Sequence, residues 1–368
     1  MAPALREGIA RRFPLVARPR PCCHPLEARI RQVAGLVGAA TSNSPDRAAT
    51  SAAQACNFAA LIASDCGLPG LARDLCRRQF LLFQAACPFD AATAKLALQP
   101  LINLVRLHAH NGDHASALHL TGTLLTSVRI QKAACIDGIP ADLGSLTRTP
   151  DDHREVVQWL RAVLLADGAR ALAQAGRWDE ALQYVHDHQG IGQGLLDGRQ
   201  IAIIANYAVG DVRTSADLLD QTPTPTPWEA AVAASLTALT GRDLPHATLV
   251  DRYLALDDAP QQVVFRTRLG LAILDLADGQ PGSRLASAIE ADVLQTKDAY
   301  AARDILAHPA GASLISASAH DALSRLLGAS GLGRGTMPPE FLNALTVTTT
   351  TAEASLARAL TDMTRQAP

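Results

Sequence analysis

The side chains with the most evident chemical potential gather between residues 108 and 119. They are His108, His110, Asp113, His114 and His119. Imidazole and carboxylate groups are suitable zinc ligands. On a helix, however, His108 and His110 point about 200° apart, and Asp113 falls in a turn. His114 and His119, five residues apart, do not share a helix face well. The spacing therefore predicts no metal site, and we interpret the cluster as a turn between helices with exposed histidines.

Motifs with a known catalytic mechanism are missing from the chain. It has no nucleophile elbow, kinase set or dinucleotide fingerprint. The glycine-rich stretch Gly328–Gly335 is followed by Thr336 and Met337, whereas a phosphate-binding loop ends in Gly-Lys-Ser/Thr. We therefore interpret this stretch as a flexible loop. The sequence predicts no cofactor and no metal, and it favours a protein that is not an enzyme.

Composition narrows the class of protein. The chain has 368 residues, is 48% hydrophobic but only 4% aromatic, and carries a net charge of −2. Such a balance gives no overall attraction to nucleic acid or to a membrane surface. No apolar run reaches the roughly 18 residues that a membrane span needs. The seven cysteines contain no CxxC pair. We therefore expect a reduced protein in the cytoplasm.

The organising pattern is the helical hairpin, seen best in Trp159–His188. Two amphipathic stretches flank a break at Gly176, where glycine can adopt a positive φ without steric cost. Gly168 and Ala181 are small residues that let the two helices approach closely. A glycine followed five or six residues later by an alanine recurs along the chain, in the pairs Gly67 and Ala72, Gly112 and Ala117, Gly176 and Ala181, Gly210 and Ala216, and Gly241 and Ala247, with a weaker case at Gly279 and Ala286.

This pattern resembles tetratricopeptide-like repeats, whose unit length is about 34 residues. The best unit is Ala162–Asp187, and the likeness covers roughly residues 47–290. The resemblance implies an all-α fold: a superhelical stack of antiparallel helix pairs, with degenerate helices at the C-terminal end. It implies little about activity, because a fold does not define a function.

In such repeats, the first helix of each hairpin lines a concave groove. Counting back from the marker alanines predicts Asn57, Arg106 and Arg170 at equivalent groove positions, with His110 and Gln174 nearby. Two guanidinium groups and an amide on one surface match the geometry of a carboxylate. The resemblance to the family's carboxylate clamp is partial. These residues predict a site for a protein or peptide segment with an acidic or C-terminal carboxylate group.

The same arginines have a structural alternative. They could form ion pairs within the stack, for example with Asp65 or Asp167. The two interpretations differ in whether the guanidinium groups are already engaged.

We divide the chain into four parts. Residues 1–25 are rich in arginine and proline and are expected to form a flexible basic arm. Residues 26–221 form the repeat stack, with an insertion at 130–154 that is expected to be a loop or a lid. Residues 222–227, TPTPTP, form a stiff spacer. Residues 228–368 supply further helical repeats and a capping helix.

The last helix is expected over Ala352–Arg365. Residues Thr346–Thr351 are locally β-prone, and Thr350 with Glu353 has the spacing of a capping box. We expect this helix to close the stack with its apolar face inward.

Three functional hypotheses follow. The first is a non-catalytic scaffold or accessory protein that binds a peptide or protein segment in its groove; a homodimer is compatible with it. The second is an all-α enzyme, or a subunit of a peptide-modifying enzyme, with the 130–154 insertion as a lid. The third is the ligand-sensing helical part of a bacterial regulator, although no DNA-binding module is recognisable.

Overall fold

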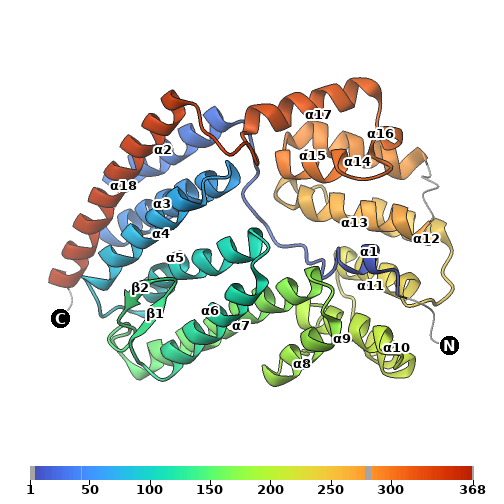
Figure 1. The fold of residues 1–368 in the computed structure, drawn as a ribbon, viewed down its shortest axis with the longest axis horizontal. Helices are drawn as coiled ribbons and strands as arrows, with labels where there is room; N and C mark the ends of the chain where they lie inside the picture. Colours follow the sequence, from blue (N-terminus) through green and yellow to red (C-terminus); the bar gives the residue numbers. More distant parts are fainter. Residues whose placement is uncertain (1–4, 43, 278–282, 367–368) are drawn as a thin grey trace. The chain divides into compact units, whose positions relative to one another are not determined.

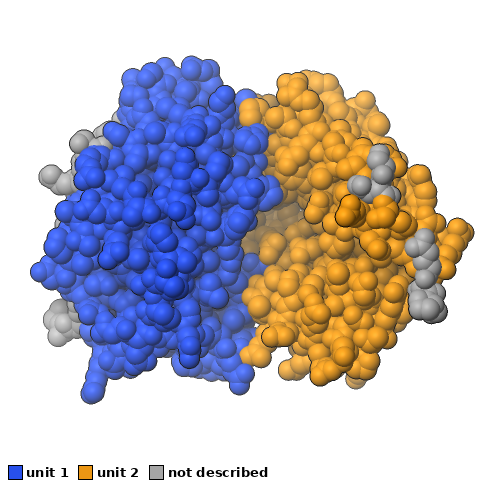
Figure 2. Space-filling model, turned by 180° about the vertical axis from the view of Figure 1, so that it is seen from behind, with its two compact units in different colours: residues 1–24, 165–330 blue, residues 25–164, 331–368 orange. Residues whose placement is uncertain are grey.

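The fold of the protein is all-α, as predicted (Figure 1). The computed structural model describes residues 5–42, 44–277 and 283–366. The chain forms two compact units, coloured separately in Figure 2. Unit 1 comprises residues 1–24 and 165–330, and unit 2 comprises residues 25–164 and 331–368.

Unit 2 consists of helices and one short hairpin of strands. Its elements are α2 (Leu26–Ser42), α3 (Pro45–Asp65), α4 (Pro69–Gln84), α5 (Ala91–His110), α6 (His114–Arg129), β1 (Ala134–Ile136), β2 (Ile139–Ala141), the first part of α7 (Pro150–Gln174) and α18 (Pro339–Gln366).

Unit 1 begins with α1 (Glu7–Ala10) and resumes in the second part of α7 at Leu165. Its further elements are α8 (Trp178–Asp187), α9 (Asp197–Ala208), α10 (Val212–Asp220), α11 (Pro227–Leu239), α12 (His246–Leu254), the 3₁₀ helix η1 (Pro260–Gln262), α13 (Val263–Leu276), α14 (Ser283–Thr296), α15 (Ala299–Leu306), α16 (Gly311–Leu314) and α17 (Ala317–Ser330).

The predicted turn glycines end helices as expected. Gly67, Gly112, Gly176, Gly210 and Gly241 all have positive φ angles, between +72° and +91°. A residue with a Cβ atom is strained in this conformation, which explains the regular placement of glycine. Asp113 and Asp211 cap the helices that follow Gly112 and Gly210 through their side-chain oxygens. The sixth predicted turn glycine, Gly279, lies outside the described residues.

The core of unit 2 is built around α3. This helix contacts α2, α4, α5 and α18. Its buried side chains are mostly methyl groups, among them Ala52, Ala53, Ala59 and Ala63. Small side chains let four helices approach one backbone closely, which accounts for a large core in a chain with few aromatic residues.

The 130–154 insertion is an ordered part of unit 2. Asp137 and Gly138 form a two-residue turn, both with positive φ, between β1 and β2. The side chains of Ile136 and Ile139 are buried in the core of the unit. Residues from Pro150 onward already belong to α7. The insertion therefore carries core side chains, unlike the surface loop that we expected.

The N-terminal residues also differ from the expected flexible arm. Phe13, Leu15 and Cys23 are at most 4% exposed. Proline does interrupt helix formation here, but an extended chain can still pack its side chains against helices. Figure 1 shows this extended connection between α1 and α2.

The proline-rich spacer 222–227 joins α10 to α11 within unit 1. Thr226 and Glu229 form a capping box at the start of α11. Trp228 packs edge-on against the ring of Phe265, with the ring centroids 6.2 Å apart.

The last helix begins earlier than predicted. α18 starts at Pro339 and contains the whole threonine run. Thr349 donates its hydroxyl hydrogen bond to the carbonyl of Leu345. Its neighbours in the run likewise bond to carbonyls four residues earlier. Glu353 is not a cap, because its carboxylate accepts a 2.9 Å hydrogen bond from Arg78 of α4. Packing of α18 against α2 and α3 outweighs the β preference of threonine.

Candidate binding surface on the first helices of unit 2

The first helices of two consecutive hairpins, α3 and α5, lie against each other in unit 2. The second helices of the same hairpins, α4 and α6, approach each other less closely. α3 and α5 are therefore the closer of these two pairs of helices.

A hydrogen bond between two amide side chains joins these helices. Asn103 of α5 donates from Nδ2 to Oδ1 of Asn57 of α3, at 3.0 Å. Both side chains are partly buried. The sequence argument selected Asn57 as a groove residue but did not identify Asn103, because the contact depends on how two distant helices align. An asparagine one turn before the predicted Arg106 is the signal that could have found it.

Further side chains reach solvent along the same two stripes. Spacings of three and four residues place them on one side of each helix. We call this set the α3–α5 face: Gln54, Asn57 and Leu61 of α3, with Gln99, Asn103, Arg106 and His110 of α5. Arg106 and His110 are exposed. The face carries amides, a guanidinium group, an imidazole and the apolar side chain of Leu61. It suits an anionic or carbonyl-rich ligand.

The other two predicted groove residues belong to unit 1. Gln174 is exposed at the end of α7. Arg170 donates from a terminal guanidinium nitrogen to Oδ1 of Asp197, at 2.8 Å. Asp197 is only 3% exposed and also binds Arg18. Arg170 therefore makes the kind of structural ion pair that we considered as the alternative.

Of the two carboxylates named for that alternative, Asp65 pairs with Arg29 of α2. Asp197 could not be recognised from the sequence, because it lies 27 residues beyond Arg170 and meets it only through the packing of α7 and α9.

One histidine of the predicted cluster, His108, contacts two carboxylates. Nε2 of His108 lies 2.9 Å from Asp137, and Nδ1 lies 3.2 Å from Asp113. Arg73 of α4 also binds Asp137, at 2.6 Å. Both ring nitrogens of His108 are thus engaged. Within the described part of the chain, no group of three or more ligating side chains is arranged to hold a metal ion.

The pKa values of these carboxyl groups reflect the contacts. Burial raises the pKa of Asp137, but hydrogen bonds from His108 and Arg73 outweigh it, and the net pKa lies below the usual value of 3.8. Hydrogen bonds from Ser116, followed by the one from His108, lower the pKa of Asp113. These carboxylates stay ionised near neutral pH and act as structural anchors.

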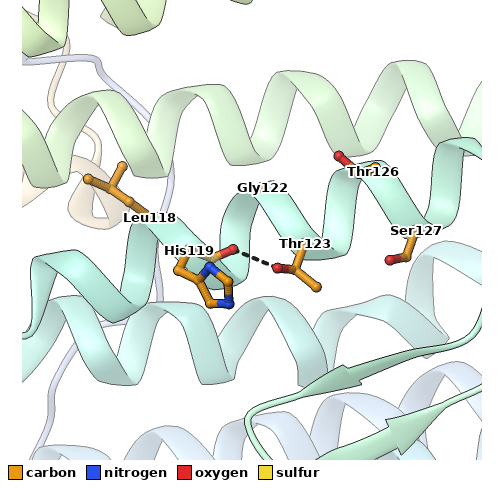
Figure 3. Close-up of a pocket in the computed structure, with 6 residues that line it drawn as sticks. All are labelled: Leu118, His119, Gly122, Thr123, Thr126 and Ser127. Carbon is orange, nitrogen blue, oxygen red and sulfur yellow. Dashed lines mark hydrogen bonds between the residues drawn. The ribbon is translucent and has the colours of Figure 1, made fainter.

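A shallow hollow of about 480 Å³ lies on α6 (Figure 3). Its lining consists of Leu118, His119, Gly122, Thr123, Thr126 and Ser127. The hydroxyl group of Thr123 donates to the carbonyl oxygen of His119, at 2.9 Å. His119 is the one titratable side chain of this lining, and the Thr123 hydroxyl group bonds to its backbone carbonyl and not to its ring.

The buried cysteines are poor nucleophiles. Burial raises the pKa of Cys56 and of Cys76 to about 12. A thiol with such a pKa holds almost no thiolate at neutral pH. Both side chains act as small apolar core groups.

Comparisons with protein-family models, with curated proteins and with solved structures find no match to this chain. In the portion of the chain that the structure describes, no helix combines the length and apolar character needed to cross a membrane.

Proposed function

We propose that this protein is a non-catalytic binding protein in which helices α3 and α5 hold a peptide or protein segment. The observation that carries the proposal is the α3–α5 face. Two adjacent first helices carry the amides of Gln54, Asn57, Gln99 and Asn103 together with Arg106 and His110, and a hydrogen bond joins Asn57 to Asn103. Amide side chains recognise the backbone of an extended segment through donor and acceptor together.

The charge of the face selects the class of ligand. A guanidinium group matches a carboxylate in geometry as well as in charge. We infer that the bound segment carries an acidic side chain or a free C-terminal carboxylate near Arg106. Arg170 and Gln174 belong to unit 1, and we do not include them in this site.

A reducing compartment, the cytoplasm, fits this proposal. All seven cysteines lie among the described residues and are free. Four of the seven are buried, and Cys135 is exposed. An exposed thiol persists most readily where glutathione keeps cysteines reduced.

The lid hypothesis receives no comparable support. A lid must lift from the site that it covers. The insertion instead buries Ile136 and Ile139 and ties Asp137 to two helices through His108 and Arg73.

A binding experiment tests the proposal. Full-length protein is titrated with peptides that differ only in a free or an amidated C-terminus. The free acid is expected to bind, and Arg106→Ala is expected to weaken binding at least tenfold. Arg170→Ala serves as the matched control, with affinity within about twofold of the unsubstituted protein. Equal binding of acid and amide, or no effect of Arg106→Ala, would contradict the site.

A further inference from the structure

Residues 11–24 cross unit 1 as an extended segment that is bound like a peptide. From Arg11 to the start of α2 the chain has no helix or strand. It nevertheless buries Phe13, Leu15 and Cys23, which are at most 4% exposed. The helices that hold it come from residues 165–330 of the same unit.

Unit 1 recognises the backbone of this segment. Gln200, a fully buried residue of α9, receives a hydrogen bond from the N–H of Leu15 and donates one to its carbonyl oxygen, both at 2.8 Å. The N–H of Arg20 donates to the carbonyl of Gln261, at 3.2 Å. The carbonyl of Cys23 accepts from the N–H of Ala299, at 2.8 Å. Backbone bonds at intervals along an extended chain are the usual mode of peptide recognition.

Arginine side chains of the segment meet carboxylates of the unit. Asp197 of α9 uses its two oxygens differently. Oδ1 accepts from Arg170 of the unit itself, at 2.8 Å, and Oδ2 accepts from Arg18 of the segment. Because Arg170 already fixes this carboxylate, Asp197 is oriented for a guanidinium group whether or not Arg18 is present.

Two more carboxylates divide their oxygens in the same way. Oδ1 of Asp275 lies 3.0 Å from Nε2 of His308, while Oδ2 accepts from Arg12, at 2.9 Å. Oδ1 of Asp298 caps the first turn of α15, while Oδ2 accepts from the N–H of Cys23, at 3.0 Å. In each carboxylate, a group from residues 165–330 of unit 1 contacts one oxygen, and the segment donates a hydrogen bond to the other.

Three carboxylates that each use one oxygen within unit 1 and the other toward the segment are typical of a preorganised binding site. A contact that only packed an N-terminal tail would not require three carboxylates to be held independently of that tail. A binding site does require it, because groups fixed in advance lose little entropy on binding. The guanidinium group of Arg20 also lies over the ring of Tyr300, 4.2 Å from its centroid.

We propose that this surface of unit 1 binds an extended, arginine- and proline-containing segment of a partner protein, and that residues 11–24 are its resident competitor. The site takes basic segments, whereas the α3–α5 face of unit 2 is proposed for acidic ones. The two proposals rest on different residues and can fail separately.

The resident segment and a partner segment would compete for the same site on unit 1. A segment tethered to its own site has an effective concentration in the millimolar range. A partner segment therefore binds only when the resident one is weakened or displaced. Its side chains must supply an apolar group at the position of Leu15 and a guanidinium group at that of Arg18.

The test uses the full-length chain and a fluorescein-labelled peptide with the sequence of residues 10–24. In the variant Leu15→Asp with Arg18→Glu, the resident segment loses its buried leucine and presents like charge to Asp197. Fluorescence anisotropy is expected to show saturable binding to this variant, at least tenfold tighter than to the unsubstituted protein. Adding Gln200→Leu should weaken binding at least tenfold, and so should a peptide that carries Arg18→Glu.

A second variant guards against loss of the fold. Arg18→Glu alone changes a side chain that is 47% exposed, so its helical circular dichroism and melting transition should match those of the unsubstituted protein. Absence of saturable binding to a folded variant would overturn the proposal, as would binding that Gln200→Leu leaves unchanged. A variant that forms a dimer by exchanging its segment, without binding the peptide, would also overturn it.

Discussion

The buried ion pair between Arg29 and Asp65 is a sensitive test of the helix packing in unit 2. Arg29 of α2 is 1% exposed and Asp65 of α3 is 4% exposed. The guanidinium group also lies 5.5 Å from the ring centroid of Phe58. In Arg29→Leu the carboxylate of Asp65 loses this cation while staying away from water. Removing one partner of a buried pair costs about 3–5 kcal/mol of unfolding free energy.

The expected loss of unfolding free energy can be measured in two ways. Urea unfolding followed by circular dichroism gives the change in free energy directly. For a unit of this size, each kcal/mol lowers the melting temperature by about 2–4 °C, so Arg29→Leu should melt about 6–20 °C lower.

A control on the same helix separates burial from charge. Arg31 is exposed and pairs with Glu27 one turn away, so Arg31→Leu should change stability by less than about 0.5 kcal/mol. The double variant Arg29→Leu with Asp65→Leu should recover part of the loss, because it removes the buried carboxylate as well. A loss below about 1 kcal/mol in Arg29→Leu, or equal losses at Arg29 and Arg31, would refute the reasoning.

Three further predictions concern other parts of the chain. At pH 8, iodoacetamide should label the exposed Cys135 in the folded protein, whereas Cys56, whose pKa is raised to about 12, should be labelled only after unfolding. Mass spectrometry of the peptides measures the labelling of both residues. Equal labelling would be inconsistent with the burial of Cys56. Asp137→Asn should lower stability by about 1 kcal/mol near neutral pH. Because the folded-state pKa of Asp137 lies below 3.8, the difference in unfolding free energy between the two proteins is fully present above pH 3.8 and should shrink as the pH falls through the folded pKa. Urea titrations at several pH values measure this difference. A difference that grows as the pH falls would contradict the prediction. Gly67 has a φ of +75° and lies against the backbone of another loop, so Gly67→Ala should lower the unfolding free energy by about 1–3 kcal/mol. Gly70 of α4 faces open space, so Gly70→Ala should be neutral or stabilising. Similar melting temperatures for the two variants would contradict the turn geometry.

The local rules of backbone conformation carried most of the fold prediction. The five described turn glycines were recognisable because few residues adopt a positive φ, and a helix must end where one does. Of the marker alanines, Ala72, Ala117 and Ala181 are buried, whereas Ala216 is partly exposed and Ala247 is exposed. The same rules contained a signal that we did not use. Asp137-Gly138 between alternating apolar residues is a strong marker of a hairpin, and it predicts the β1–β2 turn within the insertion.

The other features of the fold depend on contacts between segments far apart in the sequence, which local patterns do not predict. Pro14 and Pro19 correctly exclude a helix in the N-terminal residues, but no local pattern states that Gln200 holds the backbone there. The pairing of Arg170 with Asp197 likewise depends on how α7 and α9 pack. The threonine run of α18 shows the converse, because a local β preference gave way to packing on α2 and α3.

The most direct test of binding by the α3–α5 face is isothermal titration of the full-length protein with decapeptide pools. The pools carry Asp or Glu in their last three positions and have either free or amidated C-termini. Our account predicts saturable binding of the free-acid pool, with an affinity at least tenfold lower for Arg106→Ala and for Asn57→Ala. No binding of either pool, or binding that neither substitution changes, would contradict it.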